Sequence, residues 1–348
     1  MKCMVLEEFR APLVSRERPI PTPGADEAVI RVGACGVCRT DLKICAGTHP
    51  AIKRLPHIPG HEVAGEVVEV GKSVHQEIIG KHAVVYFYLS CGECDFCRKG
   101  HESLCSDLRG VIGFSEDGAY SEYVKVPVNC LFFIRPDIPF AEAAIITDAI
   151  ATPYRALTSK VRIQPGETLA VIGAGGLGIH ALQIAKAFGA RVIAIDINEK
   201  ALAAAREMGA EETLHMAKED PRERILELSG GKGVDAVADF VGKPQTQMLG
   251  LNILKVTGRF VAVGYNAVDP FQVNSQFLVS KELEIYGSRA CGRNDLKETI
   301  ELVSNAKVKP FVGGLYPLSE ANAALDKLER GDLVGRLVLV PGKDSKEI

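Results

Sequence analysis

Apolar and polar positions along the first part of the chain form short, separated runs. The runs Ala28–Val32, Val63–Val70 and Ala83–Tyr88 are rich in valine and are typical of strands. Turn-forming residues, such as Pro23-Gly24 and Pro59-Gly60, lie between them. We therefore expect the first 150 residues to form a compact, mostly β domain.

From about Gln164 onward, the apolar runs alternate with helical stretches. In the first of these stretches, Leu177, Ala181 and Ile184 lie on one stripe, as in a helix that packs on a sheet. The runs themselves have the character of parallel strands buried on both faces. They are Leu169–Ile172, Val192–Ile195, Val234–Phe240, Phe260–Val263 and Leu283–Tyr286. Alternating strands and helices over this length predict a doubly wound parallel sheet.

Two further helices and a strand are predicted near the C-terminus. The helices span Asn294–Ser304 and Ser319–Leu328, and the strand spans Arg336–Val340. A chain of 348 residues exceeds the size at which one hydrophobic core usually stops growing. The length therefore favours two domains.

The charge pattern excludes two classes of partner. Lysine and arginine together number 41, aspartate and glutamate 44, and both signs are interspersed, so the net charge is −3. Such a balance gives no electrostatic support for binding nucleic acid or a membrane surface.

Neither the N-terminus nor the most apolar stretch has the pattern of a membrane or export segment. Residues 1–13 carry Glu7, Glu8 and Arg10, where a signal peptide needs an unbroken apolar core. Glycines and His180 interrupt the stretch 168–185, which is therefore interpreted as strand, turn and helix. We expect the mature chain to start at Met1 and to lie in the cytoplasm, with its ten cysteines reduced or bound to metal.

Four closely spaced cysteines predict a structural metal lobe at residues 90–106. Two-residue gaps allow successive sulfurs to face one centre, as in tetrahedral zinc sites. The alternatives are an iron–sulfur cluster and two disulfides, but in the ferredoxin run the fourth cysteine follows after three residues, whereas seven intervene here. Disulfides require an oxidising compartment. The pattern favours zinc, held by Cys91, Cys94, Cys97 and Cys105.

A glycine-rich turn between a predicted strand and helix indicates a dinucleotide site. Its glycines permit a tight turn and let backbone amides approach a pyrophosphate at the helix N-terminus. Asp196 lies at the end of the next strand, 23 residues after Gly173, where a carboxylate accepts hydrogen bonds from the ribose hydroxyls and repels a 2′-phosphate. NAD is therefore favoured over NADP. The candidate residues are Gly173, Gly175, Gly176, Leu177, Gly178 and Asp196.

Other interpretations of these residues stay open at this point. The glycines alone are compatible with a simple strand cap, and Asp196 with a cap of the following helix. Lys200, one helical turn further on, either adds a cation near the adenosine ribose or lies on a solvated helix face.

Two upstream segments complete a recognisable set of motifs. They are Cys35-Gly36-Val37-Cys38-Arg39-Thr40-Asp41 and Gly60-His61-Glu62. A redox Cys-x-x-Cys pair normally opens a helix in a thioredoxin-like unit, whereas strand and loop are predicted around Cys35. These two segments are followed along the chain by the four-cysteine lobe and then by the glycine turn. With the four motifs in this order, the whole chain resembles the zinc-containing alcohol dehydrogenases of the medium-chain dehydrogenase/reductase superfamily.

The resemblance implies a fold and a domain organisation. It implies a GroES-like, mostly β catalytic domain formed by residues 1–150 and 290–348, and a Rossmann-type cofactor domain formed by residues 151–289. This agrees with the α/β class that the apolar pattern predicts.

The resemblance also implies a second, catalytic zinc. Its ligands would be Cys38, His61 and a third residue from the segment that leads into the cofactor domain. At that third position many family members carry a cysteine, and this chain carries Asp148. A carboxylate is a harder donor, but with one thiolate it still leaves the Zn²⁺ site formally neutral. The alternative for Asp148 is a helix-capping role.

Residues next to the ligands are assigned roles by the same resemblance. Thr40 would take the proton of the substrate alcohol, and Asp41 would hydrogen-bond His61. Glu62 would either approach the metal or, as we favour, orient the site from behind the ligands. Lys43 stands where many relatives have the histidine that ends the proton relay, and a protonated lysine is a poorer shuttle near pH 7.

Three residues are assigned to the cofactor in the same way. Arg39 and Arg336 would neutralise the pyrophosphate, and Thr152 would touch the nicotinamide. Each arginine also has a simpler interpretation as a surface or structural residue.

These inferences predict an NAD-dependent zinc alcohol dehydrogenase with two zinc ions per chain, acting on a small alcohol, aldehyde or ketone. A polyol, amino-alcohol or hydroxyacyl-CoA dehydrogenase of the same superfamily is the main alternative, because the metal and cofactor chemistry would be the same. A non-catalytic NAD-binding protein is a weaker alternative. A homo-oligomer, tetramer or dimer, is expected only by analogy.

Overall fold

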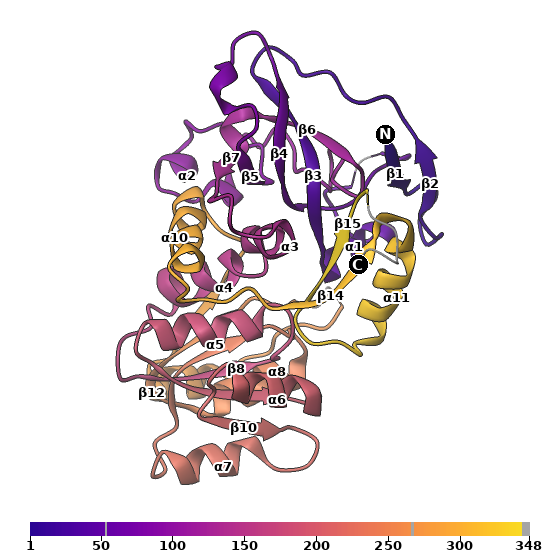
Figure 1. Ribbon diagram of the computed structural model, residues 1–348. Coiled ribbons are helices and arrows are strands. Elements are labelled where there is room, and N and C mark those ends of the chain that lie inside the picture. The colour runs from indigo at the N-terminus through magenta and orange to yellow at the C-terminus, as the bar shows by residue number, and fades with distance from the viewer. Residues whose placement is uncertain (53, 266–267, 343–348) are drawn as a thin grey trace. The chain divides into compact units, whose positions relative to one another are not determined.

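The computed structural model describes residues 1–52, 54–265 and 268–342, which form two compact units (Figure 1). Unit 1 comprises Met1–Asp148, Gly292–Ser304 and the chain from Pro310 onward. Unit 2 comprises Ala149–Cys291 and the short segment Asn305–Lys309. The predicted limits of the domains, at residues 150 and 290, differ from these bounds by two residues, and Asn305–Lys309, predicted in the first domain, lies in unit 2. The last residues of the first predicted domain, 343–348, lie outside the described residues.

Unit 1 is built around a mixed sheet in the order β14-β15-β3-β4-β5-β7, with β6 paired to β3. A separate antiparallel pair joins β1 to β2. The strands are β1 Lys2–Val5, β2 Val14–Glu17, β3 Glu27–Val37, β4 Glu62–Val70, β5 His82–Val85, β6 Tyr123–Pro127, β7 Leu131–Phe133, β14 Val312–Pro317 and β15 Arg336–Val340. The helices are α1 Arg39–Cys45, α2 Asp95–Arg98, α3 Phe140–Ala144, α10 Arg293–Ser304 and α11 Ala321–Arg330. The expectation of a mostly β catalytic part is confirmed.

Strand β3 is longer than its apolar run predicts. The expected strand ended at Val32, but β3 continues to Val37 because it pairs with β4 on one side and with β15 on the other. Gly36 permits this close pairing, since a Cβ there would lie 2.1 Å from Oε2 of Glu62. The strand therefore delivers the chain directly to Cys38.

Unit 2 contains a six-stranded parallel sheet in the order β10-β9-β8-β11-β12-β13. The strands are β8 Thr168–Ile172, β9 Arg191–Asp196, β10 Glu212–His215, β11 Val234–Asp239, β12 Leu254–Ala262 and β13 Glu284–Gly287. The helices are α4 Ala151–Arg155, α5 Gly178–Ala187, α6 Glu199–Glu207, α7 Pro221–Leu228, α8 Pro244–Asn252 and α9 Ser275–Lys281. The predicted doubly wound sheet is confirmed. The strand order reverses between β8 and β11, which is where such sheets bind their ligands.

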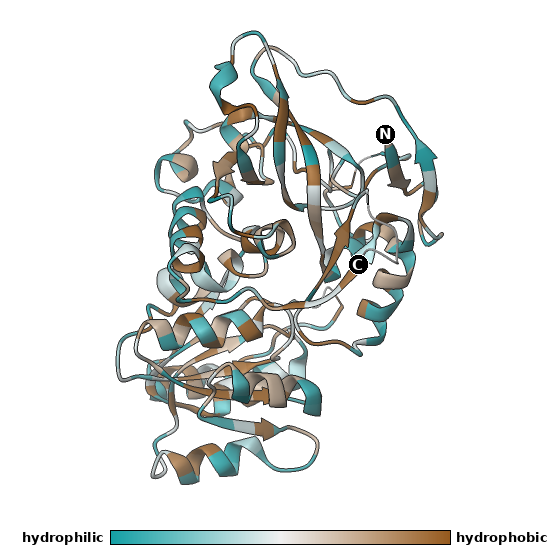
Figure 2. Cartoon of the chain, in the orientation of Figure 1, coloured by the Kyte–Doolittle hydropathy of each residue, from teal (hydrophilic) through white to brown (hydrophobic). Residues whose placement is uncertain are grey.

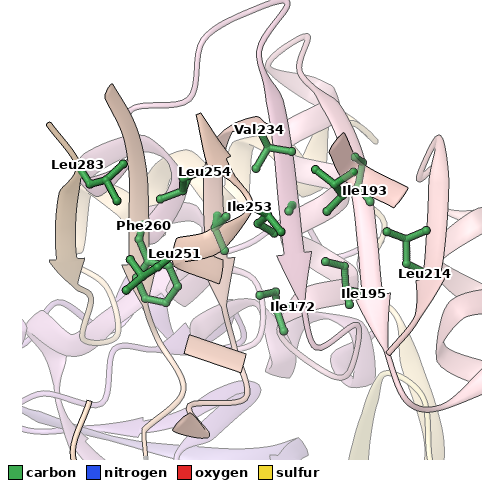
Figure 3. Packing of buried hydrophobic residues seen from close by; sticks show 13 residues of the cluster. Ile172, Ile193, Ile195, Leu214, Val234, Leu251, Ile253, Leu254, Phe260 and Leu283 are labelled. Atoms are coloured by element: carbon green, nitrogen blue, oxygen red, sulfur yellow. The ribbon is translucent and has the colours of Figure 1, made fainter. Parts of the chain in front are cut away.

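The strands of unit 2 are apolar runs in the sequence because their side chains form its buried core. Side chains from successive strands, such as Ile172, Ile195 and Phe260, meet in one buried cluster (Figure 3). In Figure 2 the strands of unit 2 are largely brown, whereas its helices also carry teal residues. Strand β10 was missed because it is an edge strand with polar residues at its ends, Glu212 and His215.

Among the residues that the structure describes, no helix is long and apolar enough to cross a bilayer.

Candidate metal centres and cofactor site

One group of buried metal-binding side chains gathers at the end of strand β3. Cys38 follows β3 and is the N-cap of α1, whereas His61 and Glu62 stand at the start of β4. The antiparallel register pairs Gly36 with Glu62, which brings these segments together. Asp148 reaches the same place from the short helical turn Ile145–Thr147. The ligand atoms of Cys38, His61, Glu62 and Asp148 all lie within 4.8 Å of one another, and all four residues are buried.

The distances within this group fit a small tetrahedral cation. Oδ2 of Asp148 lies 3.5 Å from Sγ of Cys38 and 4.0 Å from Nε2 of His61. A tetrahedral zinc with ordinary bond lengths would separate a sulfur and an oxygen ligand by about 3.5 Å, and a nitrogen and an oxygen ligand by about 3.3 Å. The first separation agrees, and the second requires only a small movement of the ring or the carboxylate.

Asp41 supports the His61 ring from the opposite side. Its Oδ1 lies 3.2 Å from Nδ1 of His61, although the ring N–H is not aligned for a regular hydrogen bond. Its Oδ2 accepts a hydrogen bond from the backbone N–H of Cys38 at 2.8 Å. Burial opposes a charge on His61, but Asp41 and Cys38 outweigh it and raise the pKa of the ring well above its usual value. The site thus attracts positive charge at His61.

Arg336, the first residue of β15, contacts carboxylates in this structure. Its Nη2 donates to Oδ2 of Asp148 at 2.8 Å and lies 3.0 Å from Oε1 of Glu62. The guanidinium is buried among these groups in unit 1. A role at the cofactor phosphate, as the resemblance implies, stays a prediction. The sequence pattern did not indicate the contact with Asp148.

The carboxylate of Glu62 is buried without aligned hydrogen-bond donors among the described residues. It is completely buried, and among the described residues neither of its oxygens has an aligned hydrogen-bond partner. Burial raises its pKa, although the positive charge of Arg336 lowers it. A buried carboxylate without aligned donors is costly unless a cation lies near it, and the Arg336 guanidinium is that cation. The sulfur, nitrogen and oxygen donors of Cys38, His61 and Asp148 are by themselves a set that fits a zinc ion, with Glu62 behind them.

A second metal-binding group lies in the loop around α2. Sγ of Cys105 lies 3.5 Å from that of Cys91 and 3.8 Å from that of Cys94, and Cys91 and Cys97 are 3.9 Å apart. Four sulfurs around a tetrahedral zinc would be about 3.8 Å apart. All ten cysteines are free thiols, so the disulfide alternative has no support in the structure.

Backbone amides prepare these sulfurs for a cation. The amide of Cys94 donates to Sγ of Cys91, and the amide of Cys91 donates to Sγ of Cys105. Backbone hydrogen bonds from Cys97 and Ser106 lower the pKa of Cys94 below its ordinary value. Amide donors of this kind stabilise thiolates, which are the form that binds zinc. At Cys97 and Cys105 burial outweighs them and raises the pKa of the thiol.

The glycine-rich turn of unit 2 is tight at two of its glycines and open at a third. It connects β8 to α5, and Leu177 is the N-cap of that helix. Gly173 has a φ of +88°, and a Cβ at Gly178 would lie 1.8 Å from the carbonyl oxygen of Gly173, so both positions need glycine for the turn itself. A Cβ at Gly175, in contrast, would meet no atom of the described chain within 4 Å. Glycine there leaves room for a ligand to approach the backbone.

Besides its predicted contact with the ribose, Asp196 forms hydrogen bonds with the backbone around the glycine turn. It ends β9, and its Oδ2 accepts a hydrogen bond from the amide of Ala174 in the glycine turn at 2.7 Å. Its Oδ1 accepts from the amides of Ile197 and Asn198. The cap of α6 is Asn198, whose side chain accepts from the amide of Lys200. Asp196 is therefore not the helix cap, and it connects the glycine turn to the next strand.

The other candidate residues take varied positions. In unit 1, Arg39 is exposed at the start of α1, and Oγ1 of Thr40 lies 3.6 Å from Sγ of Cys38. In unit 2, Thr152 is buried in α4 and Lys200 is exposed on α6. The roles of Arg39, Thr152 and Lys200 toward a cofactor stay predictions.

Aromatic rings enclose the histidine of the first site. The rings of Phe87 and Phe114 lie 5.1 and 4.8 Å from that of His61. The ring of His49 lies 5.0 Å from that of Phe114. His57 is buried and contacts the carbonyl oxygen of Gly113 at 3.1 Å, as a structural residue would. No sequence motif marks Phe87 or Phe114, because single phenylalanines have no characteristic spacing.

Comparison with known proteins agrees with this arrangement. Residues 24–136 match the alcohol dehydrogenase GroES-like domain, and residues 176–305 match the zinc-binding dehydrogenase domain. An NAD-dependent alcohol dehydrogenase of Sulfurisphaera tokodaii is 37% identical over 350 residues, which cover 98% of this chain and 100% of that protein. The chain belongs to the zinc-containing alcohol dehydrogenase family. It is therefore an oxidoreductase.

Further relatives support the family across the whole chain. An alcohol dehydrogenase of Geobacillus stearothermophilus is 37% identical over 97% of this chain and 98% of its own length. The crystal structure of the alcohol dehydrogenase of the archaeon Aeropyrum pernix has a TM-score of 0.91 at 31% identity, covering 98% of this chain and 100% of that one. Membership of the zinc-containing alcohol dehydrogenase family confirms both the expected fold and the expected class of enzyme.

Proposed function

We propose that this protein interconverts an alcohol and its aldehyde or ketone with NAD as the hydride partner, at a zinc held by Cys38, His61 and Asp148. The observation that carries the proposal is the convergence of one thiol, one imidazole and two carboxylates in a buried group. Glu62 would pair with Arg336, which leaves Cys38, His61 and Asp148 as the zinc ligands. Three protein ligands leave a fourth position for substrate, as catalytic zinc sites require. A closed structural site would need four protein ligands, as in the four-cysteine group.

Zinc bound there would supply Lewis acidity, which lowers the pKa of an alcohol hydroxyl toward neutrality. The residues of this chain would do the rest. Thr40, whose hydroxyl lies 3.6 Å from the Cys38 sulfur, would accept the substrate proton and pass it on. Asp41 would hold the His61 ring so that Nε2 faces the group of ligands. Phe87 and Phe114 would exclude water from the His61 side of the site.

Glu62 and Arg336 would balance the charge of the site. Arg336 contacts both Glu62 and Asp148, so one cation is shared between two buried carboxylates. We infer that Arg336 orients the Asp148 carboxylate, while Glu62 keeps the guanidinium in place. Glu62 then acts behind the three ligands, as the sequence suggested.

The proton exit is proposed to involve residues other than Lys43. Lys43 lies on α1, and its carbonyl oxygen accepts from the amides of Thr48 and His49. His49 contacts the ring of Phe114, which itself contacts His61, so His49 is closer to the site than its sequence position suggests. His57 is excluded from this role by its burial against Gly113.

NAD is proposed as the cofactor because of Asp196. We expect Asp196→Gly to lower kcat/KM for NAD by about tenfold or more, since hydrogen bonds to a charged group contribute roughly 1.5–3 kcal/mol. Activity with NADP should rise relative to NAD, because the carboxylate that repels the 2′-phosphate is gone. Steady-state kinetics with both cofactors measure the ratio.

Asp196→Asn is the matched control for this prediction. Its amide oxygen can still accept from Ala174, so the glycine turn stays in place while the negative charge is removed. If both variants retain the original preference for NAD, Asp196 does not select the cofactor.

A substrate screen tests the proposed function. Purified protein with two zinc ions per chain is assayed for NADH formation with primary and secondary alcohols, polyols, amino alcohols and hydroxyacyl-CoA thioesters. We expect turnover with at least one class and none in Cys38→Ser. The last three classes are the alternative substrates, and their turnover alone would redefine the substrate but not the reaction. An absence of turnover in every class would contradict the proposal.

Two further properties are proposed. The absence of disulfides among the ten cysteines, five of which are proposed zinc ligands, favours a reducing compartment, and so the cytoplasm. A homo-oligomer, dimer or tetramer, is proposed by analogy with the family, and light scattering of the purified protein tests it.

A further inference from the structure

A buried tyrosine lies behind the Asp41–His61 pair. The hydroxyl of Tyr120 donates to Oδ2 of Asp41 at 3.0 Å, and both side chains are completely buried. The same oxygen accepts from the amide of Cys38, and Oδ1 faces Nδ1 of His61. Tyr120 therefore belongs to a continuous chain of polar contacts that ends at the His61 ring.

The local structure fixes where the Tyr120 ring lies. The amide of Tyr120 donates to the carbonyl oxygen of Pro59, and the amide of Ala119 donates to that of Gly60, so this loop runs along the segment that carries His61. Gly60 has a φ of +99°, and a Cβ there would lie only 2.3 Å from Cδ1 of Tyr120. The ring thus occupies the space that a side chain at residue 60 would need.

The hydroxyl acts as a donor toward Asp41. Burial, followed by the charge of Asp41, raises the pKa of Tyr120 well above its usual value, so the phenol keeps its proton. A buried carboxylate needs such donors, because an oxygen without them carries a large desolvation cost. The Tyr120 and Cys38 donors both act on Oδ2, which leaves Oδ1 to face the imidazole.

We propose that Tyr120 is a positioning residue for the catalytic metal: its hydroxyl fixes the Asp41 carboxylate, and through it the His61 ring. This inference rests on the proposed function, because it assumes that His61 binds zinc. Partners behind metal ligands commonly change metal affinity or activity by about 10- to 100-fold. Tyr120 stands one contact further away, so we expect the lower end of that range.

The test is zinc retention by Tyr120→Phe, which keeps the ring and removes only the hydroxyl. Holoprotein is titrated with a chromogenic chelator, and Cys38→Ser, which should hold only the four-cysteine zinc, identifies the catalytic ion. We expect the catalytic zinc of Tyr120→Phe to bind about tenfold more weakly than that of the unmodified protein. The four-cysteine zinc should be unchanged, which a general loss of structure would not produce.

Tyr123→Phe is the matched control, because it removes a tyrosine hydroxyl three residues away, in β6, and should leave both zinc ions unaffected. Asp41→Asn provides a second measurement. In that background Tyr120→Phe should have much less effect, because the carboxylate that the hydroxyl positions is gone. This comparison remains informative if the single variant is less stable.

The outcomes separate the two hypotheses. If Cys38→Ser holds as much zinc as the unmodified protein, the catalytic metal site and the proposed function are wrong. If the unmodified protein holds a Cys38-dependent zinc and Tyr120→Phe holds it equally tightly, only the role of Tyr120 is wrong. An equal effect of Tyr120→Phe with and without Asp41 would also overturn it.

Discussion

Cys38→Ser and His61→Ala should abolish turnover while leaving the chain folded. The zinc content should fall from two ions to one per chain, because each change removes one of only three protein ligands. A metal acting as a Lewis acid supplies several kcal/mol of transition-state stabilisation, so we expect a loss in kcat on the order of a thousandfold or more. Metal analysis, far-UV circular dichroism and NADH-linked kinetics measure these three quantities.

Cys130→Ser is the control for this prediction. Cys130 is a buried thiol of the same unit, next to β7 and outside both metal-binding groups. Its substitution should leave the zinc content and kcat within about twofold of the unmodified protein, with only a modest loss of stability. Full activity in Cys38→Ser or His61→Ala would refute the catalytic assignment.

We expect the effect of an Asp148 substitution on zinc binding to depend on the metal-binding atom that the new side chain offers. Asp148 also accepts from Arg336, so removing its charge affects both the metal and a buried guanidinium. Oδ2 of Asp148 accepts from Arg336, and in the proposed site the same oxygen would also bind the zinc. Replacement of one partner in such a buried network is costly, because the other charge is left without a counter-ion.

Cys97→Ser should release the zinc of the four-cysteine lobe and lower the melting temperature by about 10 °C. Structural zinc contributes folding free energy directly, and a loss of several kcal/mol corresponds to a shift of this size. The lobe contains only the four-residue helix α2 and short turns, so it has little other structure to keep its shape. Thermal unfolding with parallel zinc analysis measures both effects.

Loss of zinc from the four-cysteine lobe should also destabilise α10. Oε2 of Glu102, which lies three residues before Cys105, accepts from the amide of Arg293 at the start of that helix. The Arg293 guanidinium packs over the ring of Phe132 at 4.9 Å. If the lobe loses its structure, the amide of Arg293 loses the hydrogen bond to Glu102 at the start of α10. Hydrogen exchange in α10 should therefore increase.

Arg98→Ala is the matched control within the same lobe. Arg98 is exposed in α2 and is not a ligand, so its substitution should change the free energy of unfolding by no more than about 0.5 kcal/mol. If Cys97→Ser retains two zinc ions and an unchanged melting temperature, the four cysteines do not form a structural zinc site.

Features that depend on neighbouring residues could be predicted from the sequence. The four-cysteine lobe spans few residues, so its spacing alone indicates a common centre. The glycine turn could likewise be predicted, because Gly173 and Gly178 serve a local strand-to-helix turn. Apolar runs predicted the inner strands of the parallel sheet, since burial on both faces removes polar residues from them.

Features that depend on contacts between distant residues were beyond these patterns. The end of β3 is a strand because β4 and β15 pair with it, and the Cys35–Val37 segment carries no separate strand signal. The edge strand β10 has too few apolar residues to be distinguished from a loop.

The sequence by itself determined the class of chemistry: which residue types are present, in what order, and where the local turns lie. The tertiary structure alone decided how the groups combine. It directs Arg336 to Asp148 and connects Tyr120 to Asp41 across 79 positions of the chain. The physical reason is that the distance between a donor and an acceptor far apart in the sequence depends on how strands and loops pack. Once it is buried away from water, each polar group also needs a partner within the protein.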